Sequence, residues 1–194
     1  MLRRSEPGSI TAELKHQGTV LGGTTITLWA IEVFNSLTAH FADLLLGIRP
    51  HSLSGLWGIF FAPFLHANFM HLAANTVPFL VLGWLIMARE GRDFWIVSAI
   101  AALAAGLGTW LFGSANTVHV GLSGVIFGYL GFLLLRGYFE RSFLSIALSL
   151  VVGFFWGSAL WGVLPLQAGV SWEGHLFGFL GGVLAARLLA RPRK

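Results

Sequence analysis

Apolar residues run through the sequence in six long stretches, separated by charged residues or by loops that contain Gly and Pro. Each stretch is near the ~20 residues that a helix needs to cross the hydrocarbon core of a bilayer. None alternates apolar and polar positions as a barrel strand does, and a backbone in lipid must satisfy its own hydrogen bonds, so we expect helices. The stretches are residues 22–46, 69–88, 93–113, 122–138, 143–164 and 172–190.

The first stretch is the most polar of the six. It carries Glu32, Asn35, His40 and Asp43, which we expect to face the bundle or to lie near the outer interface. Residues 1–19 are basic but lack the apolar core of a signal peptide, so the first helix is expected to stay as an uncleaved anchor. The sequence thus predicts an N-terminal tail, a six-helix membrane domain and a basic C-terminus, over residues 1–19, 20–190 and 191–194.

Composition supports a membrane protein and excludes several other classes. Hydrophobic residues make up 56% of the chain and charged residues 10%, whereas a soluble domain carries roughly a quarter charged residues. Disorder needs the opposite composition, with low hydrophobicity and high charge. The sequence contains no Cys, which excludes disulfides, Cys-ligated zinc, iron–sulfur clusters and cysteine nucleophiles.

The basic residues are distributed unequally between the two sides of a six-span model. Of the 12 Lys and Arg residues, only Arg49 falls between the first and second helices. The positive-inside rule therefore predicts that both termini are cytoplasmic. This asymmetry accounts for the net charge of +4 without nucleic acid as a partner, and it allows contact with anionic lipid. The Lys and Arg residues on the predicted cytoplasmic side are Arg3, Arg4, Lys15, Arg89, Arg92, Arg136, Arg141, Arg187, Arg191, Arg193 and Lys194.

Three polar clusters open the second, fourth and sixth helices, all of which run from outside to inside. Polar groups in spanning helices are costly, so they are usually functional or packed inward. Asn75, Ser123 and His175 each lie about 18–21 Å along the helix from the next inner arginine. The clusters are therefore predicted to meet at one depth, below the outer surface. Their members are His66, His71 and Asn75; Gly121, Ser123 and Gly124; and His175, Gly178 and Gly182.

These residue types suit acyl transfer. A neutral His within hydrogen-bond reach can activate a Ser as nucleophile, and the four-residue spacing of Gly178 and Gly182 allows helices to approach closely. His71 and Asn75, at i and i+4, share a helix face and can stabilise an oxyanion with the Ser123 N–H. No carboxylate is placed to complete a triad, so we favour a Ser123–His175 dyad.

Other interpretations remain open at this point. The Gly-x-Ser-Gly segment alone is typical of a helix-packing stripe, with Ser123 bonded to its own backbone. His175 alone is typical of an interior histidine with satisfied hydrogen bonds. His66, His71 and Asn75 could form a polar clamp or bind a metal, but carboxylates are scarce at this depth and we predict no metal.

Taken together, the motifs resemble those of the rhomboid family of intramembrane serine proteases over about residues 20–190. Gly121, Ser123 and Gly124 resemble the family's Gly-x-Ser-Gly nucleophile motif. The segment from His175 through Gly178 to Gly182 resembles its His-x-x-Gly-x-x-x-Gly element, and His66, His71 and Asn75 match its His-x4-His-x3-Asn pattern. The resemblance implies an all-α, six-helix bundle, a Ser123–His175 dyad, an oxyanion hole from His71, Asn75 and the Ser123 N–H, and no cofactor.

The resemblance also implies membrane-spanning substrates, single-span or polytopic, cleaved near the outer side of a membrane that we expect to be a bacterial inner membrane. Two positions depart from the family pattern. Gly58 follows Trp57 where Arg is common, and Phe127 stands where a Tyr often stacks on the catalytic His. The alternatives are a catalytically silent rhomboid-like scaffold that binds transmembrane helices, and a small transporter. Labelling of Ser123 by a fluorophosphonate would distinguish the enzyme from both.

Overall fold

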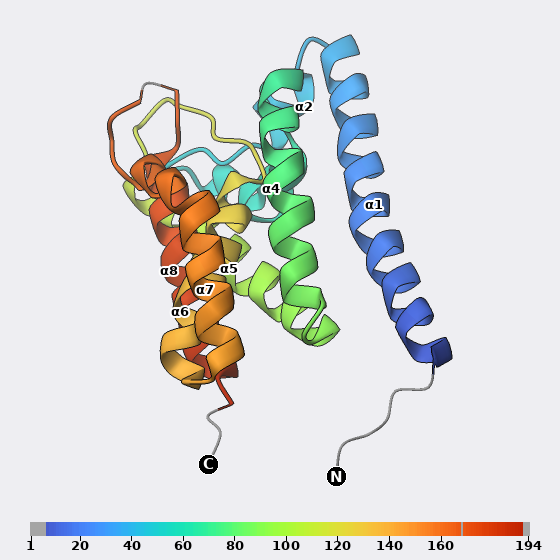
Figure 1. The fold of residues 1–194 in the computed structure, drawn as a ribbon. Coiled ribbons are helices and arrows are strands. Elements are labelled where there is room, and N and C mark those ends of the chain that lie inside the picture. The colour runs from blue at the N-terminus through green and yellow to red at the C-terminus, as the bar shows by residue number, and fades with distance from the viewer. Residues whose placement is uncertain (1–6, 168, 192–194) are drawn as a thin grey trace.

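The computed structural model describes residues 7–167 and 169–191. Within them the fold is helical, with no strand and a single isolated bridge between Ile48 and His119. Figure 1 shows the long helices side by side in a bundle, with the start of α1 and the end of α8 at the same end. The α-helices are α1 (Pro7–Leu37), α2 (Phe41–Leu46), α3 (Gly58–Phe61), α4 (Phe69–Met87), α5 (Gly91–Phe112), α6 (Ser123–Glu140), α7 (Phe143–Trp156) and α8 (Trp172–Leu189). Short 3-10 helices cover η1 (Leu53–Trp57), η2 (Ala62–Phe64) and η3 (Gly157–Val163).

In the described part of the chain, four helices are long and apolar enough to cross a membrane: Ile10–Leu37, Phe69–Met87, Gly91–Phe112 and Phe143–Val163. The prediction of membrane-spanning helices is confirmed for these four, and the count of six stays a prediction. The remaining long helices, α6 and α8, lie against each other in the bundle. Arg136 and Glu140 of α6 and Glu173 of α8 are buried in the protein, so these helices do not need the apolar character of lipid-facing ones.

The bounds predicted for the first helix are wrong at both ends. α1 already starts at Pro7 and ends at Leu37, because Ala39 and His40 adopt left-handed backbone angles, with φ of 53° and 58°. The chain then restarts as α2, and the Asn35 amide fixes the turn by donating to Asp43 Oδ1 at 2.8 Å. Asn35 and Asp43 are buried, as is Glu32, so the expectation that this polar group faces the bundle is confirmed for these three.

The α6–α8 crossing sets the spacing at the centre of the bundle. A Cβ atom added to Gly178 would collide with the carbonyl oxygen of Gly124, and one added to Gly182 would collide with that of Gly128. Only glycine lets the two backbones come this close. The predicted role of the glycine stripes in close helix approach is therefore confirmed.

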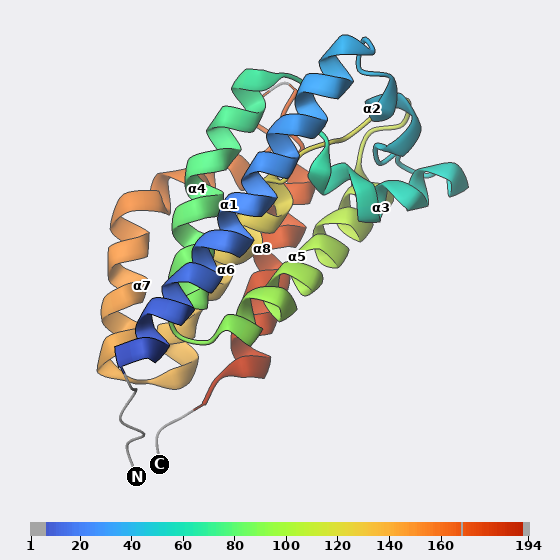
Figure 2. The ribbon, with the colours of Figure 1, turned by 90° about the vertical axis from the view of Figure 1, so that its right-hand side faces the viewer.

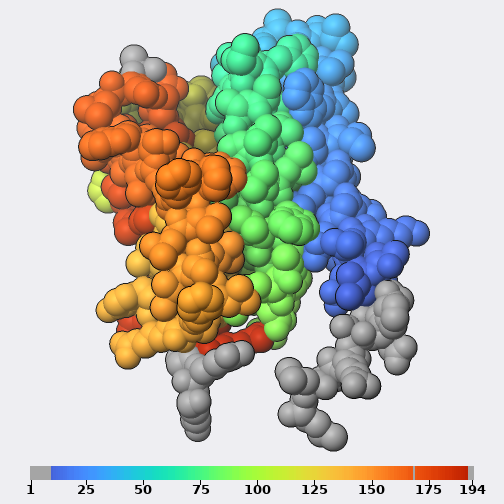
Figure 3. Space-filling model, viewed as in Figure 1, coloured from blue at the N-terminus to red at the C-terminus, as the bar shows by residue number. Residues whose placement is uncertain are grey.

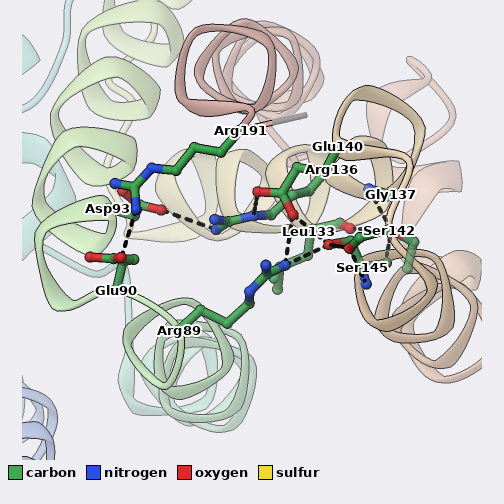
Figure 4. A network of polar contacts seen from close by, with 11 residues as sticks. Arg89, Glu90, Asp93, Leu133, Arg136, Gly137, Glu140, Ser142, Ser145 and Arg191 are labelled. Carbon is green, nitrogen blue, oxygen red and sulfur yellow. Dashed lines mark hydrogen bonds and ion pairs between the residues drawn. The ribbon is translucent and has the colours of Figure 1, made fainter. Parts of the chain in front are cut away.

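A buried ionic network ties the helices together at the end where α4, α6 and α8 finish, called here the Arg-rich end (Figure 4). Arg136 is 4% exposed; it pairs with Asp93 at 3.1 Å and with Glu140 at 2.8 Å. Arg89 reaches the same Glu140 at 2.8 Å and donates to Ser145 Oγ at 2.6 Å. The network thus joins residues at the ends of α4, α5, α6 and α7.

The connection from α1 to α4 lies at the opposite end, where α4, α6 and α8 begin, called here the site end. Figure 2 shows α2 and α3 in this connection, with α3 beside α5. A Cβ atom added to Gly58 would collide with the backbone of Gly47 and Ile48. The departure from Trp-Arg to Trp57-Gly58 therefore has a steric cause, since no side chain fits at residue 58.

Candidate active site

A cavity of about 740 Å³ opens at the site end, and Ser123, His175, His71 and Asn75 all line it. Its walls come from α4, α6, the start of α8, the segment 114–120 and Trp156 at the end of α7. In the space-filling view a furrow runs between α4 and the α7 side of the molecule (Figure 3). The structure thus brings together the three polar clusters that the sequence places at one depth.

Ser123 and His175 lie within hydrogen-bond distance. Ser123 is the first residue of α6, His175 is in the first turn of α8, and the His175 Nε2–Ser123 Oγ distance is 2.9 Å. The other ring nitrogen, Nδ1, lies 2.9 Å from the carbonyl oxygen of Gly162. A carbonyl only accepts, so Nδ1 carries the proton and Nε2 is left to accept from the Ser123 hydroxyl.

The Gly162 carbonyl is the partner of His175 that sequence reasoning missed. It belongs to η3, and no side-chain motif marks it, because the interacting group is backbone. Among the described residues no carboxylate hydrogen-bonds His175. A Cβ atom at Gly162 would lie 3.0 Å from Phe127 and 3.2 Å from His175 Nδ1, so a glycine at this position is the only trace in the sequence.

Phe127 covers one face of the His175 imidazole. Its ring stacks on His175 with centroids 4.0 Å apart and planes 9° apart. Phe127 follows Ser123 by one helical turn, so α6 supplies both the hydroxyl and the stacking ring. Phe127 therefore stacks on His175 as expected of a Tyr at this position, but it has no hydroxyl to form a hydrogen bond.

The side chains of His71 and Asn75 line the same cavity as Ser123. Asn75 is buried, and its Nδ2 has no hydrogen-bond partner among the described residues. Gly121 adopts φ +126°, and a Cβ atom there would lie 2.7 Å from His71 Cε1 and 3.8 Å from Asn75 Nδ2. An orphaned buried donor costs stability and calls for an explanation, and a ligand oxygen in the cavity would supply its partner. Ser123 opens α6, where backbone N–H groups lack partners within the helix.

His66 accepts a hydrogen bond from the backbone at the start of α6. It is fully buried, it lies edge-on to His71 with ring centroids 5.2 Å apart, and its Nε2 accepts from Leu122 N–H at 3.4 Å. Burial lowers the pKa of His66 to about 4, and the neighbouring His71 contributes. His66 is therefore neutral near pH 7, as an acceptor must be.

The remaining histidines lie elsewhere or are already paired. His40 pairs with Asp43, His51 contacts the Leu111 carbonyl, and His119 contacts Thr117 Oγ1 at 2.7 Å. In residues 7–167 and 169–191 no group of three or more His, Asp or Glu side chains is placed to hold a metal ion.

Comparison with known proteins identifies the family. Residues 53–192 match the model of the Rhomboid domain. The uncharacterised protein Rv1337 of Mycobacterium tuberculosis is 45% identical over 95% of this chain and 82% of its own length. An uncharacterised protein of Mycobacterium leprae is 44% identical over 90% of this chain and 74% of its own. The "Putative rhomboid protease YdcA" of Bacillus subtilis is 27% identical over 86% and 85%. Because the domain match covers most of the residues and includes all three polar clusters, the chain belongs to the rhomboid family.

Proposed function

We propose that this protein is an intramembrane serine endopeptidase that hydrolyses peptide bonds in or near the transmembrane segments of other membrane proteins. The single observation that carries the proposal is the 2.9 Å contact between His175 Nε2 and Ser123 Oγ, with Nδ1 committed to the Gly162 carbonyl. Family membership supports the same activity. The reaction needs no cofactor.

The proposed mechanism uses the groups in the cavity. Ser123 Oγ attacks the scissile carbonyl carbon, and its proton passes to His175 Nε2. The resulting oxyanion accepts hydrogen bonds from Asn75 Nδ2, from the His71 side chain and from the Ser123 N–H. When the tetrahedral intermediate collapses, His175 donates its proton to the leaving amine, and an acyl-enzyme on Ser123 remains. A water molecule deprotonated by His175 then releases the acid and restores both residues.

We also propose an orientation in the membrane. The Lys and Arg distribution predicts that the Arg-rich end is cytoplasmic, so the cavity opens toward the outer side of a bacterial cell membrane. Arg3, Arg4, Arg193 and Lys194 lie outside the described residues, while Arg89, Arg92, Arg136 and Arg187 support the assignment from within the helical part. Single cysteines placed at 91 and at 116 should be labelled from opposite sides, and labelling of 91 from outside would overturn the orientation.

The direct test of the proposed function is cleavage of a panel of single-span reporter proteins by the purified protein in liposomes. A fluorophosphonate should label the wild type, and Ser123→Ala should abolish both labelling and cleavage. His175→Ala should abolish cleavage as completely, and the double variant should be no worse than either, because the two residues act as a unit. Activity retained by Ser123→Ala would refute the proposal, and binding of reporters without cleavage by the wild type would favour a scaffold.

A further inference from the structure

The active-site cavity contains an acidic side chain to which the proposed mechanism gives no role. Glu173 is the second residue of α8, lies two positions before His175 and lines the 740 Å³ cavity. It is 5% exposed, so the protein covers almost all of it. Glu173 does not complete a triad, because His175 Nδ1 is hydrogen-bonded to the Gly162 carbonyl.

Glu173 has no counter-charge in the described protein. It makes no hydrogen bond or ion pair with any residue in 7–167 or 169–191. No Lys or Arg lines the cavity, and the other titratable groups there are His71, His119 and His175. The Glu173 carboxylate oxygens are not among the fully enclosed, unpartnered side-chain atoms of the described residues, so they reach the cavity. The buried carboxylates of Asp93 and Glu140 at the Arg-rich end are instead paired with arginine.

His119 does not act as the missing partner. Its Nε2 is already within 2.7 Å of Thr117 Oγ1. Burial lowers the pKa of His119, and the Glu173 charge only partly opposes that effect. His119 is therefore uncharged near neutral pH, and among the described residues that line the cavity Glu173 is the acidic one.

The position of Glu173 relative to the dyad indicates which part of a substrate it would meet. Along α8 it lies about 3 Å from His175 toward the site end. A peptide whose scissile carbonyl sits at Ser123 Oγ therefore passes Glu173 with the residues on the site-end side of the cleaved bond. The start of a helix favours a negatively charged side chain, and Glu173 lies in the first turn of α8 beside the cavity.

We propose that Glu173 is a specificity-determining residue that binds a cationic side chain of the substrate, lysine or arginine, on the site-end side of the scissile bond. The inference rests on the proposed function, because it assumes that a substrate chain is cleaved in this cavity. The substrate class that follows is a membrane protein with a basic residue within a few positions of the cut, outside its transmembrane segment.

The test is a positional scan on the wild-type protein. A single-span reporter that is already cleaved receives Lys, Gln or Glu at each of six positions on the site-end side of the cut, and kcat/KM is measured in liposomes. At one or two positions Lys should exceed Gln by about ten- to a hundredfold, the range of a hydrogen bond to a charged group. Glu at the same positions should fall below Gln.

Two variants separate recognition from a purely local role. Glu173→Gln should remove the preference for Lys over Gln, and Glu173→Lys should reverse it in favour of Glu. Glu13→Gln is the matched control, because it removes an exposed carboxylate on α1 with the same change in net charge and should leave the preference intact. Fluorophosphonate labelling checks that each variant keeps an assembled site.

The outcomes are distinct. If the wild type cleaves the reporter but Lys, Gln and Glu are equivalent at every position, the Glu173 proposal is wrong and the protease stands. If Glu173→Gln slows all reporters equally while the Lys preference persists, Glu173 acts only on the start of α8, and the proposal is also wrong. If no reporter is cleaved and Ser123 is not labelled, the proposed function fails and this inference fails with it.

Discussion

The contact between α6 and α8 makes Gly178→Ala the most discriminating substitution in the bundle. An ideal Cβ atom at residue 178 would stand 2.8 Å from the carbonyl carbon of Gly124, whereas two carbon atoms in contact are about 3.5–4.0 Å apart. The helices must therefore separate by about 1 Å at this crossing. Gly124 directly follows Ser123, and Gly178 lies one turn beyond His175, so the separation reaches the dyad.

The size of the effect follows from that displacement. Adding about 1 Å to the 2.9 Å distance between His175 Nε2 and Ser123 Oγ takes it beyond hydrogen-bond range. A misplacement of this size costs about 10²-fold in rate. Overpacking should also lower the free energy of unfolding by about 1–3 kcal/mol. We therefore expect Gly178→Ala to lower the catalytic rate by a larger factor than it lowers the fraction of folded protein.

The assay is the second-order rate of fluorophosphonate labelling, measured together with thermal unfolding. Gly22→Ala is the matched control, because it makes the same change in the middle of α1 where a Cβ atom meets nothing within 4 Å. It should label at the wild-type rate. Labelling of Gly178→Ala within about threefold of wild type, in place of the ~10²-fold loss, would refute the argument that the glycine contact positions the dyad.

Three further predictions concern other parts of the site. Asn75→Ala should lower kcat by about 10²–10³-fold with little change in KM, because an oxyanion donor acts on the transition state; an effect on KM alone would assign Asn75 to substrate binding. Joining Ala74→Cys on α4 to Ala159→Cys on η3 should block cleavage of transmembrane reporters but not labelling, and cleavage at full rate would exclude entry between these elements. Acidification from pH 6.5 to 4 should lower the stability of the wild type, because the pKa of His66 lies near 4 in the fold and near 6.5 in the unfolded chain. On acidification the unfolded chain binds this proton at a higher pH than the folded chain does, which favours unfolding. His66→Gln should therefore reduce the loss of stability between pH 6.5 and pH 4.

Spacing along the chain predicted which polar residues share one cavity, but it did not predict the bounds of the first helix. Ser123, His175, His71 and Asn75 could be placed together because helical rise and direction fix the depth of a residue in a membrane. That prediction depends on regular geometry, which spacing along the chain encodes directly. The stacking of Phe127 on His175 was instead implied by the resemblance to the rhomboid family.

The features that the sequence did not predict depend on contacts that spacing does not encode. The Gly162 carbonyl orients His175 through a backbone atom, which every residue carries. The break between α1 and α2 follows from two left-handed residues and the Asn35–Asp43 hydrogen bond, a local effect that hydropathy cannot register. The place of Glu173 on a cavity wall without a described Lys or Arg depends on residues distant in the sequence, which spacing does not encode.

One end of α7 is hydrogen-bonded to α6, whereas the other end presents exposed aromatic side chains. At the Arg-rich end, Ser149 Oγ donates to the Leu133 carbonyl at 2.7 Å and accepts from Gly137 N–H at 3.1 Å, which pins the lower half to α6. At the other end, Phe154, Phe155 and Trp161 are exposed. A swing of ~10° about the pinned half moves the free end, ~20 Å away, by ~4 Å. Gly162 rides on that free end, so a swing that admits a substrate also withdraws the acceptor from His175 Nδ1. For the proposed protease we therefore expect an open form with a misaligned base, whose reactivity returns on closure over a bound chain.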